Sequence, residues 1–173
     1  YFLTGGRRLE SDLYRVYYGD NTQNTGNPPV AELSDAQQIR RKLEAYQGAP
    51  KPGAVDFAWP YLKNEDRFIR YAARIVIEHQ PVASWQEKAL QEKDPATLTG
   101  AALALARQGS ANVKDQLLKA LTGINYTQLS WSQQIDLLRA FELTFALMGL
   151  SSSPVKSEVI ANLNPQYPAK TIE

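Results

Sequence analysis

The sequence predicts an all-α fold, a right-handed α-solenoid of about four helix pairs preceded by a short N-terminal β-hairpin. Three observations predict it. From residue 34 onward apolar residues recur at three- and four-residue spacing, which is typical of one-sided helices. Caps and helix breakers divide that stretch into eight short helices. Equivalent residues then recur at fixed offsets, which indicates stacked pairs that share one core.

The first residues of the chain predict a β-hairpin. Residues 1–4 and 13–18 are rich in aromatic and β-branched side chains, and a polar stretch with glycine separates them. Residues 19–29 carry no large apolar side chain, so burial cannot repay the entropy lost on ordering them. The sequence therefore predicts three segments, a β-hairpin (1–18), a flexible linker (19–33) and a helical domain (34–173).

Each expected helix has a start or stop signal. Ser34 with Gln37 has the pattern of a capping box. Asp94 followed by Pro95 is an N-cap with proline at the first helical position. The other helices are expected over 54–62, with a kink or an end at Pro60, over 65–78, from Pro81, from Ser110, from Ser130 to Gly149 and over about 154–163.

Apolar stripes on these helices indicate the core. The longest helix has a broad stripe made up of Trp131, Ile135, Leu138, Phe141, Phe145 and Met148. Two earlier helices align at an offset of 29 positions, Ile69 with Leu98 and Ala73 with Ala102 (98 − 69 and 102 − 73). A third copy is offset by 40 (149 − 109), with its extra length in the 123–130 connection.

The first copy resembles the HEAT repeat. Asp66 lies in the expected turn between two helices, Ile69 and Arg70 follow, and Ala72-Ala73 would sit where the helices cross closely. The resemblance implies a right-handed stack in which Asp66 caps its helix or pairs with Arg70 at i, i+4. The second copy has Thr99 in place of the arginine, which interrupts the implied aspartate–arginine ladder.

A second resemblance covers nearly the whole chain. The opening Tyr-Phe-Leu-Thr-Gly-Gly and the later Leu-Tyr-Arg-Val-Tyr are similar to the closing strands of a sorbosone-dehydrogenase-like β-propeller. Residues 40–44, 58–62, 66–74 and 78–81 resemble the helical region that follows this propeller in large secreted dehydrogenases of planctomycete type. The resemblance implies a periplasmic or secreted fragment of a larger protein, with haem in a separate C-terminal cytochrome-c-like domain and no catalytic residue here.

Composition narrows the chemistry. The 173 residues include no cysteine and a single histidine, His79, which excludes thiolate chemistry and multi-histidine metal sites within them. Nineteen basic and 18 acidic side chains leave a net charge of +1, which gives no reason to expect nucleic acid. No apolar run approaches the ~20 residues of a membrane span. We therefore expect no cofactor in this segment, and partners among neighbouring domains or another protein.

Four residues of one expected helix form the candidate binding face: Arg67, Arg70, Tyr71 and Arg74. Their i, i+3, i+4, i+7 spacing would give a cationic, aromatic strip on the concave surface, suited to a carboxylate or an acidic partner. The favoured interpretation is structural, a solvated face whose arginines pair with Asp66 and Glu78. The pairs Glu10 with Asp12 and Glu65 with Asp66 are adjacent or on a loop, where nothing adapts them to acid–base catalysis.

The aromatic residues and His79 also have two interpretations. Four aromatic residues could stack on a ligand but are expected to fill seams between helix pairs: Trp59, Tyr61, Trp85 and Trp131. His79 is expected to cap a helix C-terminus, where a protonated imidazole would be favourable, rather than to ligate haem.

Three function classes remain. The leading one is a non-catalytic scaffold that separates flanking domains. The second is a binding module whose concave face takes a peptide or an anionic ligand. The third is a HEAT-like nucleic-acid enzyme such as a DNA glycosylase, which the near-zero net charge disfavours.

Overall fold

The computed structural model describes residues 1–5, 11–16 and 32–168 of the chain. The chain divides into two compact units, Tyr1–Leu33 and Ser34–Glu173, and most of the described residues are helical. The linker expected over 19–33 lies outside the described residues except for its last two. Among the described residues, no helix has the length and apolar character needed to cross a bilayer.

The first unit contains the expected β-hairpin. Strand β1 (Phe2–Thr4) pairs antiparallel with β2 (Asp12–Tyr14), in a register that opposes Leu3 to Leu13. Phe2 and Tyr14 face each other at one end, and their stacked ring centroids are 5.2 Å apart. The second strand starts one residue earlier than expected and ends at Tyr14, so residues 15 and 16 continue outside the ladder.

The second unit contains the eight expected helices, joined by short 3₁₀ turns. The α-helices are α1 (Asp35–Glu44), α2 (Ala54–Ala58), α3 (Arg67–Glu78), α4 (Gln86–Gln91), α5 (Pro95–Gln108), α6 (Lys114–Thr122), α7 (Trp131–Met148) and α8 (Ser153–Leu163). The 3₁₀ turns are η1 (Trp59–Lys63), η2 (Val82–Ser84), η3 (Ala111–Val113), η4 (Tyr126–Gln128) and η5 (Asn164–Gln166).

Side-chain caps explain where several of these helices begin. Ser34 and Gln37 form a reciprocal capping box at α1, and Ser130 and Gln133 form the same box at α7. Each box satisfies two backbone donors that the first helical turn leaves without partners. Asp94 accepts hydrogen bonds from the backbone N–H and the hydroxyl of Thr97 at the start of α5. These three starts confirm the sequence prediction.

Three expected helices are interrupted. The helix expected over 54–62 ends at Ala58 and continues as the 3₁₀ turn η1, because Pro60 lacks the N–H that an α-helix needs. The helix expected from Pro81 breaks at Trp85, which has φ −139° between η2 and α4. The helix expected to be capped by Ser110 begins instead as η3, and that serine makes no capping hydrogen bond.

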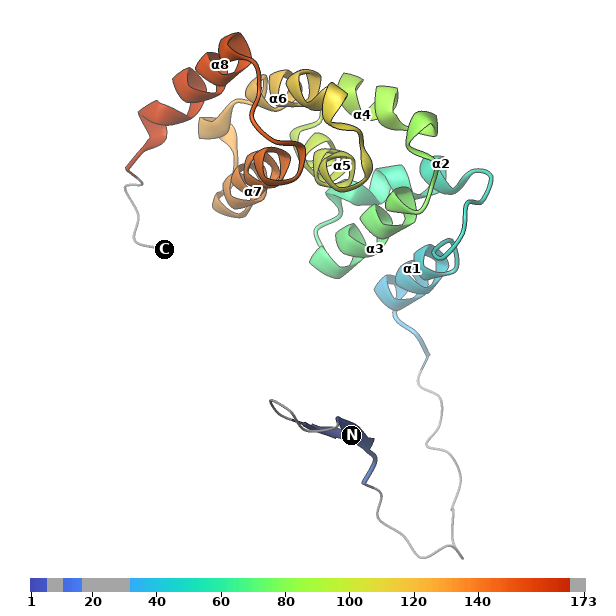
Figure 1. Ribbon diagram of the computed structural model, residues 1–173. Helices are drawn as coiled ribbons and strands as arrows, with labels where there is room; N and C mark the ends of the chain where they lie inside the picture. The colour runs from blue at the N-terminus through green and yellow to red at the C-terminus, as the bar shows by residue number, and fades with distance from the viewer. Residues whose placement is uncertain (6–10, 17–31, 169–173) are drawn as a thin grey trace, which may run out of the picture. The chain divides into compact units, whose positions relative to one another are not determined.

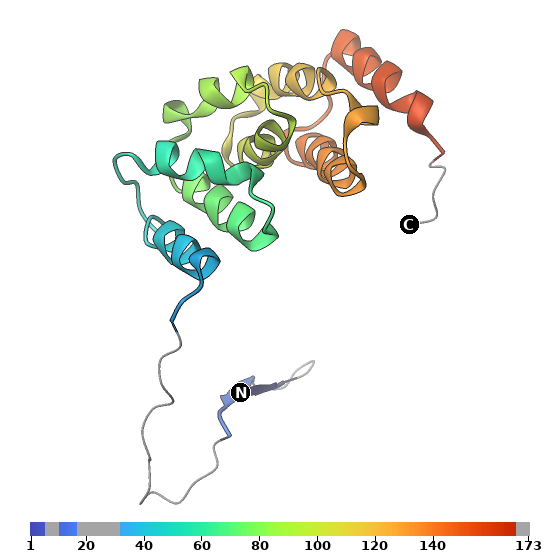
Figure 2. The same cartoon turned by 180° about the vertical axis from the view of Figure 1, so that it is seen from behind.

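The helices of the second unit lie in two rows. Helices α1, α3, α5 and α7 form one row, in which α3 packs on α1 and α5, and α5 packs on α7. Helices α2, α4, α6 and α8 form the other (Figure 1), with α2 on α3, α4 on α5 and α6 on α7. The view from behind shows the same two rows (Figure 2).

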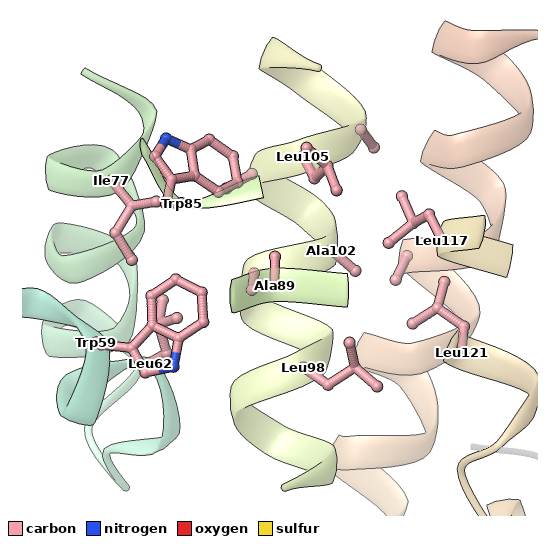
Figure 3. Packing of buried hydrophobic residues seen from close by; sticks show 14 of the residues in the cluster. Trp59, Leu62, Ile77, Trp85, Ala89, Leu98, Ala102, Leu105, Leu117 and Leu121 are labelled. Carbon is pink, nitrogen blue, oxygen red and sulfur yellow. The ribbon is translucent and has the colours of Figure 1, made fainter. Parts of the chain in front are cut away.

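The core lies between these rows. Figure 3 shows Trp59, Trp85, Leu98 and Leu117 among the buried side chains that fill it. The four alanines expected at helix crossings are almost completely buried: Ala72, Ala73, Ala101 and Ala102. A small side chain at such a crossing allows two backbones to approach closely.

The apolar stripe predicted for α7 is partly wrong. Phe141 and Met148 are buried, but Trp131, Ile135 and Leu138 are 54%, 45% and 42% exposed. The buried face of α7 is a different one, made up of Leu137, Ala140, Phe141, Thr144 and Met148. An apolar side chain is buried only where a neighbouring helix covers it, and the neighbours of α7 cover one side of this wide stripe.

Candidate functional site

A pocket of about 480 Å³ lies where the first turns of α3 and α5 face the start of α7. All four candidate residues line it: Arg67, Arg70, Tyr71 and Arg74. Thr99 and Gly100 of α5 form part of its wall, and Gln133 and Asp136 of α7 lie across from α3. The structure therefore places the predicted face beside residues of two further helices, α5 and α7, which come later in the chain.

Arg70 is held in one orientation by the backbone. Its Nη1 donates hydrogen bonds to the carbonyl oxygens of Asn64, at 2.8 Å, and Glu65, at 2.9 Å. Its Nη2 lies 3.8 Å from Oδ2 of Asp136 on α7. Of the two roles implied for Asp66, capping is confirmed, because its carboxylate accepts from the backbone N–H of Phe68 at the start of α3. The ion-pair partner of Arg70 is Asp136 instead of Asp66.

Arg74 is part of a mostly buried ion cluster beneath the pocket. Its guanidinium lies 5.2 Å from the ring centroid of Tyr71, and its Nε is 3.2 Å from Oε1 of Glu78. The angles at that contact do not form a hydrogen bond, so it is an ion pair by distance only. The second carboxylate oxygen of Glu78 accepts from Nε of Arg107 on α5. The expected pairing of Arg74 with Glu78 within α3 is confirmed. The bond from Arg107 to Glu78 then joins α5 to α3.

Arg67 differs from the other two arginines. It is exposed, and its guanidinium lies 4.9 Å from the ring centroid of its neighbour Phe68. Within the described part of the chain no carboxylate comes within ion-pair distance of it. Arg67 is therefore available to an incoming anion.

Most of the positive charge that lines the pocket is already paired. Lys63, Arg67, Arg70 and Arg74 line it together with the carboxylates of Glu65 and Asp136. Two further carboxylates pair with lining cations, Asp94 with Lys63 at 3.7 Å and Glu78 with Arg74 at 3.2 Å. Of the four lining cations, Arg67 alone has no ion pair among the described residues, so the charge available to an anionic ligand is that of Arg67 and of the weakly paired Arg70.

The residues considered as metal or haem ligands do not gather at this pocket. No group of three or more His, Asp or Glu side chains is placed to hold a metal ion in the described ranges. His79 lies at the other end of α3, where its Nδ1 accepts a hydrogen bond from the backbone N–H of Gly48 at 3.0 Å. His79 is the C-cap of α3, as the sequence predicted, and its bond to Gly48 ties the chain after α1 to the end of α3.

The tryptophans separate into two groups. Trp59 and Trp85 are buried in the core, where their indole N–H groups donate to Oε2 of Glu92 and to the carbonyl of Gln80. These two fill seams as predicted (Figure 3). Trp131 is 54% exposed, so the prediction that it is buried in a seam is wrong. Tyr61 is half-buried, with its ring tilted against that of Phe57 at 5.6 Å.

Glu92 accepts several structural hydrogen bonds that the sequence analysis did not predict. Its Oε2 accepts from the indole of Trp59 at 2.8 Å, and its Oε1 accepts from the backbone N–H groups of Lys93 and Asp94. Burial raises the pKa of this carboxyl, but the three donors outweigh it, so the pKa lies below its ordinary value. A glutamate two residues before an N-cap aspartate is a weak signal, and only the fold reveals its partner.

Comparison with known proteins gives no match, neither to a family model nor to a curated protein nor to a solved structure. The interpretation of the pocket therefore depends on its own geometry.

Proposed function

We propose that this chain is a non-catalytic helical scaffold, built as a HEAT-like right-handed α-solenoid of about four helix pairs. The observation that supports it is the packing of the long helices, since α3 contacts α1 and α5, and α5 contacts α7, while α2, α4 and α6 cover them from the second row. In such a stack each pair touches mainly its neighbours, so the stack can hold flanking domains apart. The proposed partners are neighbouring domains of a secreted oxidoreductase whose haem lies in a separate domain.

Native-state hydrogen exchange tests the stack. Leu43 of α1 is completely buried, and its replacement by alanine removes contacts at one end of the row. If stability is a sum of neighbour terms, Leu43→Ala accelerates amide exchange in α1 to α3 and leaves α7 and α8 as protected as before. A uniform acceleration from α1 to α8 would show one indivisible core and would contradict the solenoid.

A second candidate function is a binding module for an anionic ligand. Two lining arginines favour it: Arg67, whose charge no described carboxylate neutralises, and Arg70, whose contact with Asp136 is 3.8 Å long and partly exposed. In this function the pocket recognises a carboxylate through guanidinium groups, which present paired donors in a plane.

Titration with succinate at constant ionic strength tests this binding function. The expected result is a saturable shift of the backbone amide NMR signals of residues that line the pocket, among them Thr99, Gly100 and Gln133. Succinamide, which has the same shape without charge, is the matched control and should leave those signals in place. Shifts that are absent, or that spread evenly over the lysines and arginines of the surface, would count against an anion site.

A further inference from the structure

Arg70 presents a fixed hydrogen-bond donor to the pocket. Both hydrogens of its Nη1 are used by the carbonyls of Asn64 and Glu65. These two bonds hold the plane of the guanidinium and leave Nη2 facing Asp136 of α7. An arginine held in this way loses little conformational entropy when an anion arrives.

The carboxylate that faces Arg70 within the chain is weakly held. The distance from Nη2 of Arg70 to Oδ2 of Asp136 is 3.8 Å, which is within ion-pair range but too long for a hydrogen bond. The side chain of Asp136 is 50% exposed and that of Arg70 is 33% exposed. Exposed pairs of this kind contribute little free energy, so another carboxylate can displace Asp136 at small cost.

We propose that Asp136 stands in the place of a ligand carboxylate, and that the pocket binds an extended acidic peptide whose side chain displaces Asp136 from Arg70. This proposal rests on the binding function above and names its ligand. The chain's own carboxylate at Asp136 faces Nη2 of Arg70. We therefore infer that the ligand group that binds Arg70 is also a carboxylate.

The spacing of Arg67 and Arg70 fits an extended peptide. Residues three apart on a helix lie about 5–6 Å from each other on one face. Side chains two apart on an extended peptide point to the same side and are separated by about 6.5 Å. A peptide with acidic residues at alternate positions can therefore place one carboxylate on Arg70 and the next on Arg67, which has no carboxylate partner among the described residues.

The wall on α5 leaves room for a peptide backbone. Ala96, Thr99 and Gly100 are small, and the hydroxyl of Thr99 already donates to the carbonyl of Pro95 at 2.7 Å. A Cβ at Gly100 would lie 3.3 Å from Cδ2 of the buried Leu62, so this glycine lets η1 pack closely on α5 at the wall of the pocket. Tyr71, which is 58% exposed, offers a ring to the aliphatic part of the peptide.

Fluorescence anisotropy with a short labelled peptide of alternating glutamate and serine tests the proposal on the full chain. Asp136→Asn is expected to tighten binding about two- to fivefold, because it removes the competing carboxylate and keeps the shape. Arg70→Gln and Arg67→Gln are each expected to weaken it by about tenfold. Arg67→Gln removes no ion pair among the described residues, so it keeps the test valid if Arg70→Gln fails to fold.

A matched control lies on the same helix as Asp136. Arg139 pairs with Glu142 at 2.7 Å and does not line the pocket, so Arg139→Gln changes the net charge as Arg70→Gln does but should leave the affinity unchanged. Weaker or equal peptide binding by Asp136→Asn would overturn the displacement, and equal binding of a glutamine-for-glutamate peptide would overturn carboxylate recognition. Competition by inorganic phosphate as effective as by unlabelled peptide would identify a phosphate site instead. If succinate also fails to bind, the binding function itself is wrong. If succinate binds but the peptide does not, only the peptide proposal is wrong.

Discussion

Helices α5 and α7 are the two longest in the chain and have the same design, yet their surroundings differ. Each begins with a side-chain cap, Asp94 or Ser130, and each is followed by a glycine, Gly109 or Gly149. Helix α5 packs on α3 and η1, on α7, and on α4 and α6. Helix α7 packs mainly on α5 and α6.

The difference teaches that neighbours, not the apolar stripe itself, decide which side chains are buried. Eight residues of α5 are buried, among them two threonines, whereas α7 is longer and buries five. Its apolar Ile135 and Leu138 remain 45% and 42% exposed. A central helix needs small residues on most sides so that several neighbours can approach, and α5 has alanine or threonine at six of its eight buried positions.

The largest expected effect on stability comes from comparing one leucine in each of these two helices. Leu105 of α5 is completely buried, while Leu138 of α7 is 42% exposed. Leu105→Ala should lower the free energy of unfolding by about 2–5 kcal/mol, because it leaves a cavity in the core. Leu138→Ala deletes the same atoms from a partly solvated face and should cost less than about 1 kcal/mol. Urea denaturation measures both, and equal midpoints would contradict the contrast between the two helices.

The buried face of α3 gives the next largest effect on stability. Ala73 is completely buried, so Ala73→Leu should cost about 1–3 kcal/mol through overpacking. Arg70→Ala, on the pocket side of the same helix, removes a partly exposed ion pair and should cost about 0–1 kcal/mol. The comparison uses chemical denaturation of the two variants. A larger loss for Arg70→Ala would mean that its two bonds to backbone carbonyls matter more to α3 than the packing around Ala73.

Local signals explain what the sequence could predict. The caps at Ser34, Asp94 and Ser130 depend on residues within three positions of one another, so they are visible in the chain alone. The four small alanines were found because a repeat placed them at equivalent positions. The eight helices follow from the same local periodicity.

Long-range partners explain what the sequence could not predict. The four candidate residues share one helix face, but Asp136 joins them from 66 positions beyond Arg70 (136 − 70). Nothing local links the two residues. Likewise the indole of Trp59 finds its acceptor at Glu92, and the exposure of Trp131 depends on which helices lie beside α7. Such partners are fixed by the packing of helix pairs and not by any periodic pattern.

The N-caps of α5 and α7, Asp94 and Ser130, give the smallest expected effect. The stability contributed by the cap of α5 should depend on pH, whereas that of the cap of α7 should not. Burial raises the pKa of Asp94, but hydrogen bonds from the hydroxyl and backbone N–H of Thr97, with help from Lys63, lower it below the ordinary value of 3.8. The pKa of Glu92 is lowered in the same direction from 4.5. A carboxyl whose pKa is lower in the folded chain stabilises the fold above its ordinary pKa, and that stability is lost as the pH falls through the folded value. Ser130 does not titrate in this range.

We therefore expect the free energy of unfolding to decrease between about pH 5 and pH 3, and the paired replacement of Asp94 by asparagine and Glu92 by glutamine to flatten that decrease. Asparagine still accepts from the N–H of Thr97, so the cap itself survives. The side chain of Asp94 is 39% exposed, so solvent screening keeps its share below about 1 kcal/mol. Ser130→Ala is the matched control, because it should lower stability by a similar amount at every pH. Urea denaturation midpoints measured from pH 5 to pH 3 test this prediction. If the double variant loses stability with falling pH as steeply as the unaltered chain, carboxyls other than these two at the start of α5 control the acid dependence.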